Sequence, residues 1–306
     1  MLDPNELYQL TDDLPELGQP VLIQALSGFV DAGNATRLAR EHLLSTLDTR
    51  TIATFDIDQL LDYRSRRPTM VFVEDHWDHY EQPRLELHLL HDAAGTPFLL
   101  LGGPEPDFQW ERFTAALSAL VRRLEIRLTL GLNAIPMAVP HTRPIGVTAH
   151  ATRAELISGY ESWLQRIQVP GSAGHLLEYR LGEQGRDALG FAVHVPHYVA
   201  QTEYPGAAEL LLTSVSRATG LLLPTEGLRS AADAVRTDID RQVAQTDEAG
   251  SLVRALEEQY DAFTRGRGGP NLLAGQTGPL PTADELGAEL ERFLAEQGRP
   301  GDTPGN

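Results

Sequence analysis

Residues 20–220 alternate between two hydrophobic patterns, one typical of buried strands and one typical of amphipathic helices. Residues 20–26 form a short apolar run that suits a buried strand, and a polar, glycine-containing turn follows at residues 27–34. Leucines then recur at helical spacing within residues 35–47. A strand, a glycine-containing turn and a helix in this order are typical of the opening of an α/β fold.

The same succession of strand and helix continues as far as Thr219. A helix that repeatedly follows a strand predicts a parallel or mixed sheet with helices on both faces. Further strands are predicted over residues 51–56, 70–73, 85–90, 96–101, 127–132, 145–149 and 191–195, and further helices over 108–125, 153–166 and 207–219.

Beyond Pro224 the pattern is helical only. Two amphipathic helices with apolar residues every three or four positions predict a helical hairpin. A Gly/Pro-rich stretch follows, and a Thr282-x-x-Glu285 capping box then opens a short helix. We therefore predict a core domain over 1–224, a helical hairpin over 225–263, a linker over 264–281, a terminal helix over 282–297 and a disordered tail over 298–306.

Composition and charge exclude several classes of chemistry. The sequence has no cysteine, which removes disulfides and thiolate nucleophiles, and all 25 basic residues are Arg. Without lysine, the chain has neither a Schiff-base amine nor the lysine of a phosphate-binding P-loop. A net charge of −18 opposes binding to nucleic acid. Residues 1–19 do not have a signal-peptide pattern and no apolar run is long enough to cross a bilayer, so we expect a cytoplasmic protein without a membrane partner.

Several polar residues follow the predicted strands and are candidates for a ligand-binding crevice. Ligands of open α/β sheets bind outside the carboxyl ends of the strands, and two or more carboxylates beside a histidine permit acid–base chemistry. Turn chemistry and helix capping explain the same residue types without a ligand, so both interpretations stay open. The candidates are Asp31, Gly33, Glu105, Asp107, His141, Arg143 and His197.

Residues 74–81 contain a His-x-x-His pair, His76 and His79, among four acidic residues. This spacing suits a metal site only on a helix, whereas the flanking strand and Pro83 predict an exposed loop. We therefore expect no metal at this pair, and we expect Trp77 and Tyr80 to be interface anchors. No nucleotide-binding or nucleophile-elbow motif is present, and no cofactor is predicted.

Several motifs of this chain together form a pattern that resembles a known family. They are Gly28-Phe29-Val30-Asp31-Ala32-Gly33, Gly103-Pro104-Glu105-Pro106-Asp107, Val139-Pro140-His141-Thr142-Arg143-Pro144, Val195-Pro196-His197-Tyr198 and Leu256-Glu257-Glu258-Gln259-Tyr260-Asp261. The pattern resembles the proteasome assembly chaperone 2 family in its bacterial, actinobacterial-type branch, and it covers residues 5–263 together with the predicted terminal helix. The resemblance implies a three-layer α/β/α sandwich with a mixed sheet of phosphorylase/hydrolase-like topology, followed by a C-terminal helical extension.

The resemblance also implies a homo-oligomer, with a trimer favoured, and it supplies no catalytic residues. Eukaryotic relatives help to build the proteasome α-ring through a C-terminal tail of hydrophobic-Tyr type, whereas this sequence ends in Pro304-Gly305-Asn306. Two hypotheses follow. The first is a non-enzymatic assembly or interaction protein with an unidentified protein partner. The alternative is a small-molecule-binding protein or hydrolase-type enzyme that uses the crevice.

Overall fold

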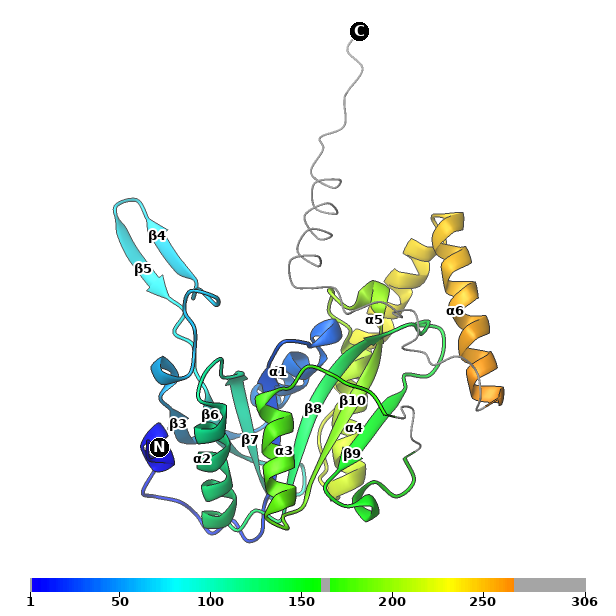
Figure 1. Ribbon diagram of the computed structural model, residues 1–306. Coiled ribbons are helices and arrows are strands. Elements are labelled where there is room, and N and C mark those ends of the chain that lie inside the picture. Colours follow the sequence, from blue (N-terminus) through cyan, green and yellow to red (C-terminus); the bar gives the residue numbers. More distant parts are fainter. Residues whose placement is uncertain (1, 161–165, 267–306) are drawn as a thin grey trace.

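The computed structural model describes residues 2–160 and 166–266, and it shows an eight-stranded sheet between two layers of helices (Figure 1). The strand order is β1-β3-β6-β7-β2-β8-β10-β9. The four central strands β7, β2, β8 and β10 run parallel to one another, whereas β1, β3, β6 and β9 pair antiparallel. The predicted α/β/α class with a mixed sheet is therefore confirmed. The strands are β1 Tyr8–Leu10, β2 Val21–Ser27, β3 Thr49–Phe55, β6 Glu86–His91, β7 Pro97–Pro104, β8 Leu128–Met137, β9 Val147–Ala151 and β10 Ala188–Pro196.

The central strands are covered on both faces, which explains their nearly unbroken apolar sequences. In β2, Val21, Ile23 and Ala25 belong to the core beneath α1 and α4, and Leu22 belongs to the core beneath α2 and α3. Successive side chains of a strand point to opposite faces, so one run of residues serves two cores. The covering helices are α1 Ala35–Thr46, α2 Trp110–Arg123, α3 Ala173–Glu183 and α4 Pro205–Thr219.

The helix predicted over residues 153–166 is wrong. The described part of this range contains only a turn of 3₁₀ helix, Ala154–Ile157, and Gly159 follows in a left-handed conformation that does not continue a helix. Residues 161–165 lie outside the described residues. The helix of this region is α3, which the periodicity did not reveal. It begins after Ser172, whose Oγ accepts a hydrogen bond from the backbone N–H of His175 at 3.0 Å.

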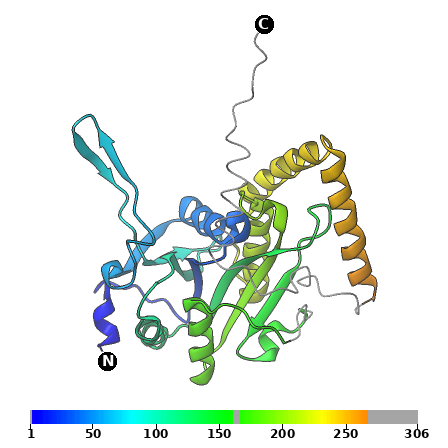
Figure 2. The same cartoon turned by 45° about the horizontal axis from the view of Figure 1, so that its top comes forward.

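A two-stranded hairpin, β4 Met70–Val73 and β5 His76–Tyr80, projects away from the body of the protein (Figures 1 and 2). The prediction of a loop over residues 74–81 is therefore wrong. Glu74 and Asp75 alone form the turn, and the next five residues are a strand. Glu74 takes the positive φ of 51° that a tight turn needs, and the aromatic residues after it favour extended backbone.

The C-terminal part of the described chain is helical, as predicted. Helix α5, Glu226–Val243, packs on α4, and helix α6, Asp247–Gly266, then turns away from it (Figure 2). The predicted terminal helix, the tail and the linker from residue 267 onward lie outside the described residues. The division into a core and a separate helical hairpin stays a prediction.

One short segment after β8 attaches α6 to the body. Tyr260 packs against Met137 and Val139, and its hydroxyl donates a hydrogen bond to the carbonyl of Pro144 at 3.1 Å. Arg143 binds both oxygens of Asp261, with N–O distances of 2.8 Å, and also binds Glu257 at 3.1 Å. Most of the polar attachment of α6 thus depends on one guanidinium group.

We expect Arg143→Gln to loosen α6, because the neutral amide cannot offset the two carboxylates that the guanidinium holds together. Hydrogen exchange of the α6 amides, measured by mass spectrometry, should become roughly three- to tenfold faster, the scale of losing two surface ion pairs, while α4 stays protected. Arg254→Gln is the matched control, because the one hydrogen bond of Arg254 among the described residues is to Ser251 of its own helix. Equal exchange of α6 in the two variants would contradict the prediction.

Candidate functional site

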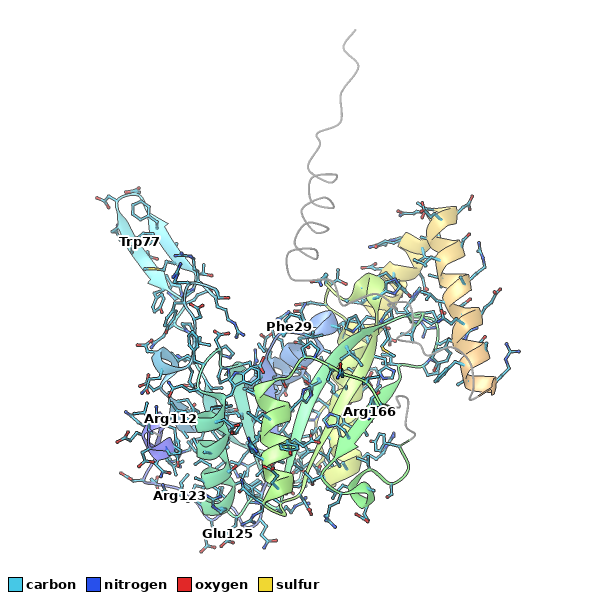
Figure 3. All side chains as sticks on the ribbon, in the orientation of Figure 1. Phe29, Trp77, Arg112, Arg123, Glu125 and Arg166 are labelled. Carbon is cyan, nitrogen blue, oxygen red and sulfur yellow. The ribbon has the colours of Figure 1, made fainter. Side chains whose placement is uncertain are left out.

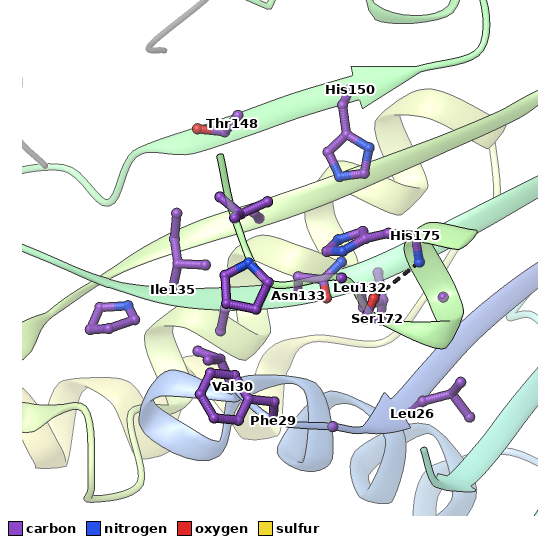
Figure 4. Close-up of a pocket in the computed structure, with 18 of the residues that line it drawn as sticks. Leu26, Phe29, Val30, Leu132, Asn133, Ile135, Thr148, His150, Ser172 and His175 are labelled. Atoms are coloured by element: carbon purple, nitrogen blue, oxygen red, sulfur yellow. Dashed lines mark hydrogen bonds between the residues drawn. The ribbon is translucent and has the colours of Figure 1, made fainter. Parts of the chain in front are cut away.

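A cavity of about 690 Å³ lies at the carboxyl ends of β2, β8 and β10, on the sheet face that α2 and α3 cover (Figure 4). Strand β9 forms one wall, and the turn after β2, with Phe29 and Val30, forms the opposite wall. Residues 167–172 and the first turn of α3 complete the lining. This is the place where open α/β sheets hold their ligands.

Small side chains on the sheet make room for the polar groups of this region. A Cβ atom on Gly190 would lie 2.2 Å from Cε1 of His150, and one on Gly131 would lie 3.0 Å from Nε2 of Gln24. Ala192, two residues after Gly190, lines the cavity. On the opposite face, the same strands carry large residues such as Phe191, which is fully buried. The hollow is therefore confined to one face of β8 and β10.

Glu105 is the buried acidic residue of the cavity. Its Oε1 accepts a hydrogen bond from the backbone N–H of Ala173, the first residue of α3, at 2.6 Å. A Cβ on Gly28 would lie 2.6 Å from Oε2 of Glu105, so the turn after β2 accommodates the carboxyl group only with glycine there. Glu105 and the Ser172 hydroxyl together occupy N–H groups at the beginning of α3.

Two histidines and a glutamate form a polar cluster at the β9 wall. Nδ1 of His150 lies 2.9 Å from Oε1 of Glu178, and the His150 ring makes an edge contact with His175, with ring centroids 5.6 Å apart. Burial, and to a smaller extent the neighbouring His150, lowers the pKa of His175. Glu178 orients the His150 ring, as carboxylates do for histidines at many functional sites.

The predicted crevice is only partly assembled, because its seven candidates fall into several separate groups. Glu105 and His197 line the cavity. Asp31 instead caps α1, since its two oxygens accept the N–H groups of Thr36 and Arg37 at 2.8 and 3.0 Å. Gly33 takes a left-handed conformation against Tyr204. For Asp31 and Gly33, the turn and capping interpretation accounts for the contacts.

Asp107 lies at the base of the β4–β5 hairpin and does not line the cavity. One of its oxygens pairs with Arg66 at 2.9 Å, and the other accepts the N–H of Asp62 at 2.8 Å. Asp107 is thus a support for the hairpin.

His141 and Arg143 face the C-terminal helices. Buried His141 lies between the Tyr198 hydroxyl, 2.6 Å from Nδ1, and Asp240 of α5, 3.0 Å from Nε2. Desolvation raises the pKa of Tyr198 to about 12, so its hydroxyl stays protonated. Together with the Arg143 contacts to α6, these bonds attach both helices to the loop after β8.

Trp77 and Tyr80 are both exposed on the hairpin. Figure 3 shows Trp77 on the projecting hairpin, well away from Phe29 in the turn after β2. A bulge in β5 places His76 and His79 opposite Val73 and Val71, on one face of the hairpin. Across residues 2–160 and 166–266, no group of three or more His, Cys, Asp or Glu residues is arranged to hold a metal ion. The absence of a metal at His76 and His79 stays a prediction.

Sequence reasoning missed the cluster of His150, His175 and Glu178. Its members come from an edge strand and from a helix that the periodicity did not predict, so no local motif joins them. The alternation of Thr148 and His150 in β9 was a usable signal, because both residues point to the cavity face.

Within the described ranges, no helix is both long and apolar enough to span a bilayer.

His194 lies next to the cavity, and the burial of its ring makes the stability of the fold depend on pH. Its Nε2 lies 2.8 Å from Oγ1 of Thr148, and burial lowers the pKa of His194 from 6.5 to about 4. The unfolded state therefore takes up this proton near pH 6.5 and the folded state only near pH 4. Stability from this group is complete above pH 6.5 and falls as the pH drops toward 4.

We expect the free energy of unfolding to fall by about 2–3 kcal/mol more in the wild type than in His194→Gln between pH 7 and pH 4. Urea denaturation at several pH values measures this difference. His76→Gln, on the exposed hairpin, is the control. Its free energy of unfolding should change with pH as that of the wild type does. Identical slopes for wild type and His194→Gln would show that the prediction is wrong.

Comparison with known proteins assigns the chain to a family. The model of the PAC2 family matches residues 25–243. No curated protein matches the chain. Among solved structures, the chain is 50% identical to the unknown-function protein Rv2714 of Mycobacterium tuberculosis, with a TM-score of 0.83 and coverage of 88% of this chain and 94% of that one.

Two further structures extend the comparison. A protein of unknown function from Corynebacterium glutamicum is 40% identical, with a TM-score of 0.81 and coverage of 84% and 98% of the two chains. The proteasome-assembly chaperone homologue Rv2125 of M. tuberculosis is 26% identical, with a TM-score of 0.70 and coverage of 76% and 99%. The expected family is thereby confirmed: the chain belongs to the PAC2 family.

Proposed function

We propose that this protein is a non-enzymatic assembly or interaction protein that works in the cytoplasm as a homo-oligomer, with three subunits favoured. The observation that carries the proposal is the β4–β5 hairpin, which exposes large apolar side chains away from the body of the protein (Figures 1 and 3). Surfaces of this kind mark sites of protein association.

The strand pairing sorts the hairpin side chains onto two faces. Met70 pairs with Tyr80 and Phe72 pairs with Trp77, so these four residues share one face. Their exposed fractions lie between 44 and 63%, and the Phe72 and Trp77 rings make an edge contact with centroids 5.1 Å apart. The face presents rings and a thioether, the side chains that are enriched in the cores of protein interfaces.

An isolated two-stranded hairpin is at best marginally stable in water, and the described residues support this one only at its base. Arg66 there donates to the carbonyl of Glu105 at 2.9 Å and pairs with Asp107. The distal part has no third strand and no covering helix in the described structure. A second copy of the chain that packs on the apolar face supplies the missing cover, and closed symmetry limits such contacts to a small oligomer.

The family supports a chaperone-like role in general terms. The name of the homologue Rv2125 refers to proteasome assembly, and we carry only the class of activity, assembly of protein complexes, to this chain. The nearer relatives from M. tuberculosis and C. glutamicum are described as proteins of unknown function. The identity of a protein partner is therefore left open in the proposal.

Light scattering coupled to size exclusion tests the oligomer. We expect a mass near three times the chain mass of 33.6 kDa, about 101 kDa, for the wild type. Trp77→Ser should dissociate the oligomer at micromolar concentration, since loss of a central interface Trp costs about 2 kcal/mol or more per contact. Tyr179→Ser is the matched control, because Tyr179 on α3 is as exposed as Trp77, at 63%.

The control variant should keep the wild-type mass. A wild-type chain that is monomeric over the whole micromolar range, or a Trp77→Ser variant that stays fully assembled, would refute the role of the hairpin.

A further inference from the structure

We propose that the cavity at the carboxyl ends of β2, β8 and β10 binds a small, mainly apolar molecule that carries no negative charge and donates a hydrogen bond to Nε2 of His150. This inference goes beyond the assembly role and does not depend on it, because none of residues 70–80 of the hairpin lines the cavity. It rests on the size of the cavity, the orientation of His150 and the charge of the lining.

The size and lining of the cavity suit a small organic ligand. Its volume of about 690 Å³ lies within the range of about 300–1,000 Å³ that ligand pockets have. Apolar side chains that a compact fold normally covers lie around it, and Phe29 and Val169 are 70 and 63% exposed. These side chains come from the turn after β2 and from the segment before α3 and face the same space. An apolar ligand removes them from water.

His150 is held in one orientation with one nitrogen left for a ligand. Nδ1 is directed at Glu178, so the proton of the neutral imidazole lies on Nδ1 and Nε2 is a hydrogen-bond acceptor. Among the described residues, Glu178 is the one hydrogen-bond partner of the His150 ring. The ring lies over Gly190, its cross-strand neighbour, where any Cβ would collide with it. The ring itself lines the cavity at the β9 wall (Figure 4).

The charge of the lining disfavours anions. Glu105 is the one acidic residue and no Arg is present among the residues that line the cavity. The beginning of α3, which by its dipole attracts anions, already donates to Glu105 and Ser172. The lowered pKa of His175 keeps this ring neutral in weakly basic solution. The ligand is therefore neutral or cationic.

Binding is tested with N-phenyl-1-naphthylamine, an uncharged aromatic amine whose fluorescence rises in apolar surroundings. At pH 8 the full-length protein should bind one probe per chain with a dissociation constant on the order of 10 µM. Ala192→Phe fills the cavity from β10 and should weaken binding at least tenfold. Ile135→Trp fills the cavity from β8. It replaces Ala192→Phe in the test if that variant does not show the wild-type melting temperature. Trp77→Ser should bind the probe as the wild type does.

Three naphthalene competitors test the chemical class of the ligand. The donor 2-naphthol should displace the probe at a lower concentration than 2-methoxynaphthalene, which has no donor, and the anion 2-naphthoate should not displace it. His150→Phe keeps a planar ring but removes the acceptor. Of the three competitors, only 2-naphthol should therefore lose affinity, by about two- to tenfold. Glu105→Gln keeps an oxygen for the Ala173 N–H and removes the negative charge, so 2-naphthoate should begin to compete.

Each arm can overturn the proposal. No saturable probe binding to the wild type, or unchanged binding in a folded cavity-filling variant, would show that the cavity is not the site. Equal competition by 2-naphthol and 2-naphthoate would refute the assigned charge. A 2-naphthol affinity unaffected by His150→Phe would refute the role of Nε2. Loss of probe binding in Trp77→Ser would place the probe on the hairpin and refute the cavity as its site. The proposed oligomer would still be tested separately, by the mass from light scattering.

Discussion

Glu105 lies just beyond β7, and its polar groups connect three parts of the chain that are distant in sequence. Its N–H donates to the carbonyl of Ser27 at 3.0 Å, which joins the ends of β7 and β2. Its carboxyl group accepts the first N–H of α3, and its carbonyl accepts a hydrogen bond from Arg66. A buried acidic group at a helix beginning is stabilised by the helix dipole and by a short hydrogen bond. The cavity lining and the hairpin base therefore meet at one residue.

This connection explains why Gly28 follows β2. The carboxyl group of Glu105 has to pass close to the turn, and a side chain at position 28 would meet Oε2 at 2.6 Å. The same reasoning applies to Gly190 under His150. In both places a glycine leaves space for a polar side chain of a neighbouring segment, and the polar side chain in turn limits where α3 and β9 can lie. Polar contacts thus determine the shape of the cavity, while apolar side chains provide most of its surface.

The sequence predicted the layers of this fold well, because strands and helices that bury one or two faces have a strict hydrophobic period. It failed at residues 153–166, where apolar residues at helical spacing meet Gly159, whose backbone is left-handed, and at α3, whose small glycine-containing face packs under Gln24. For the candidate site, proximity to strand ends selected Glu105 and His197, which line the cavity. It also selected Asp31 and Arg143, which cap α1 and attach α6. The order of residues along the chain does not reveal whether a turn residue lines the cavity or holds a helix. The group that it contacts can lie far away in the sequence.

The hairpin and the cavity have one physical property in common, since each exposes apolar groups that no other described part of the chain covers. They differ in shape, and the shape decides what can cover them. Met70, Phe72, Trp77 and Tyr80 lie on one face of a two-stranded ribbon, so only a surface of similar extent, such as a second protein chain, buries them together. Phe29 and Val169 face a hollow whose far wall carries His150, so a molecule that fits inside is required. In both proposals the apolar groups supply the free energy of association. The neighbouring polar groups, Arg66 with Asp107 or His150 with Glu178, hold the surface in place.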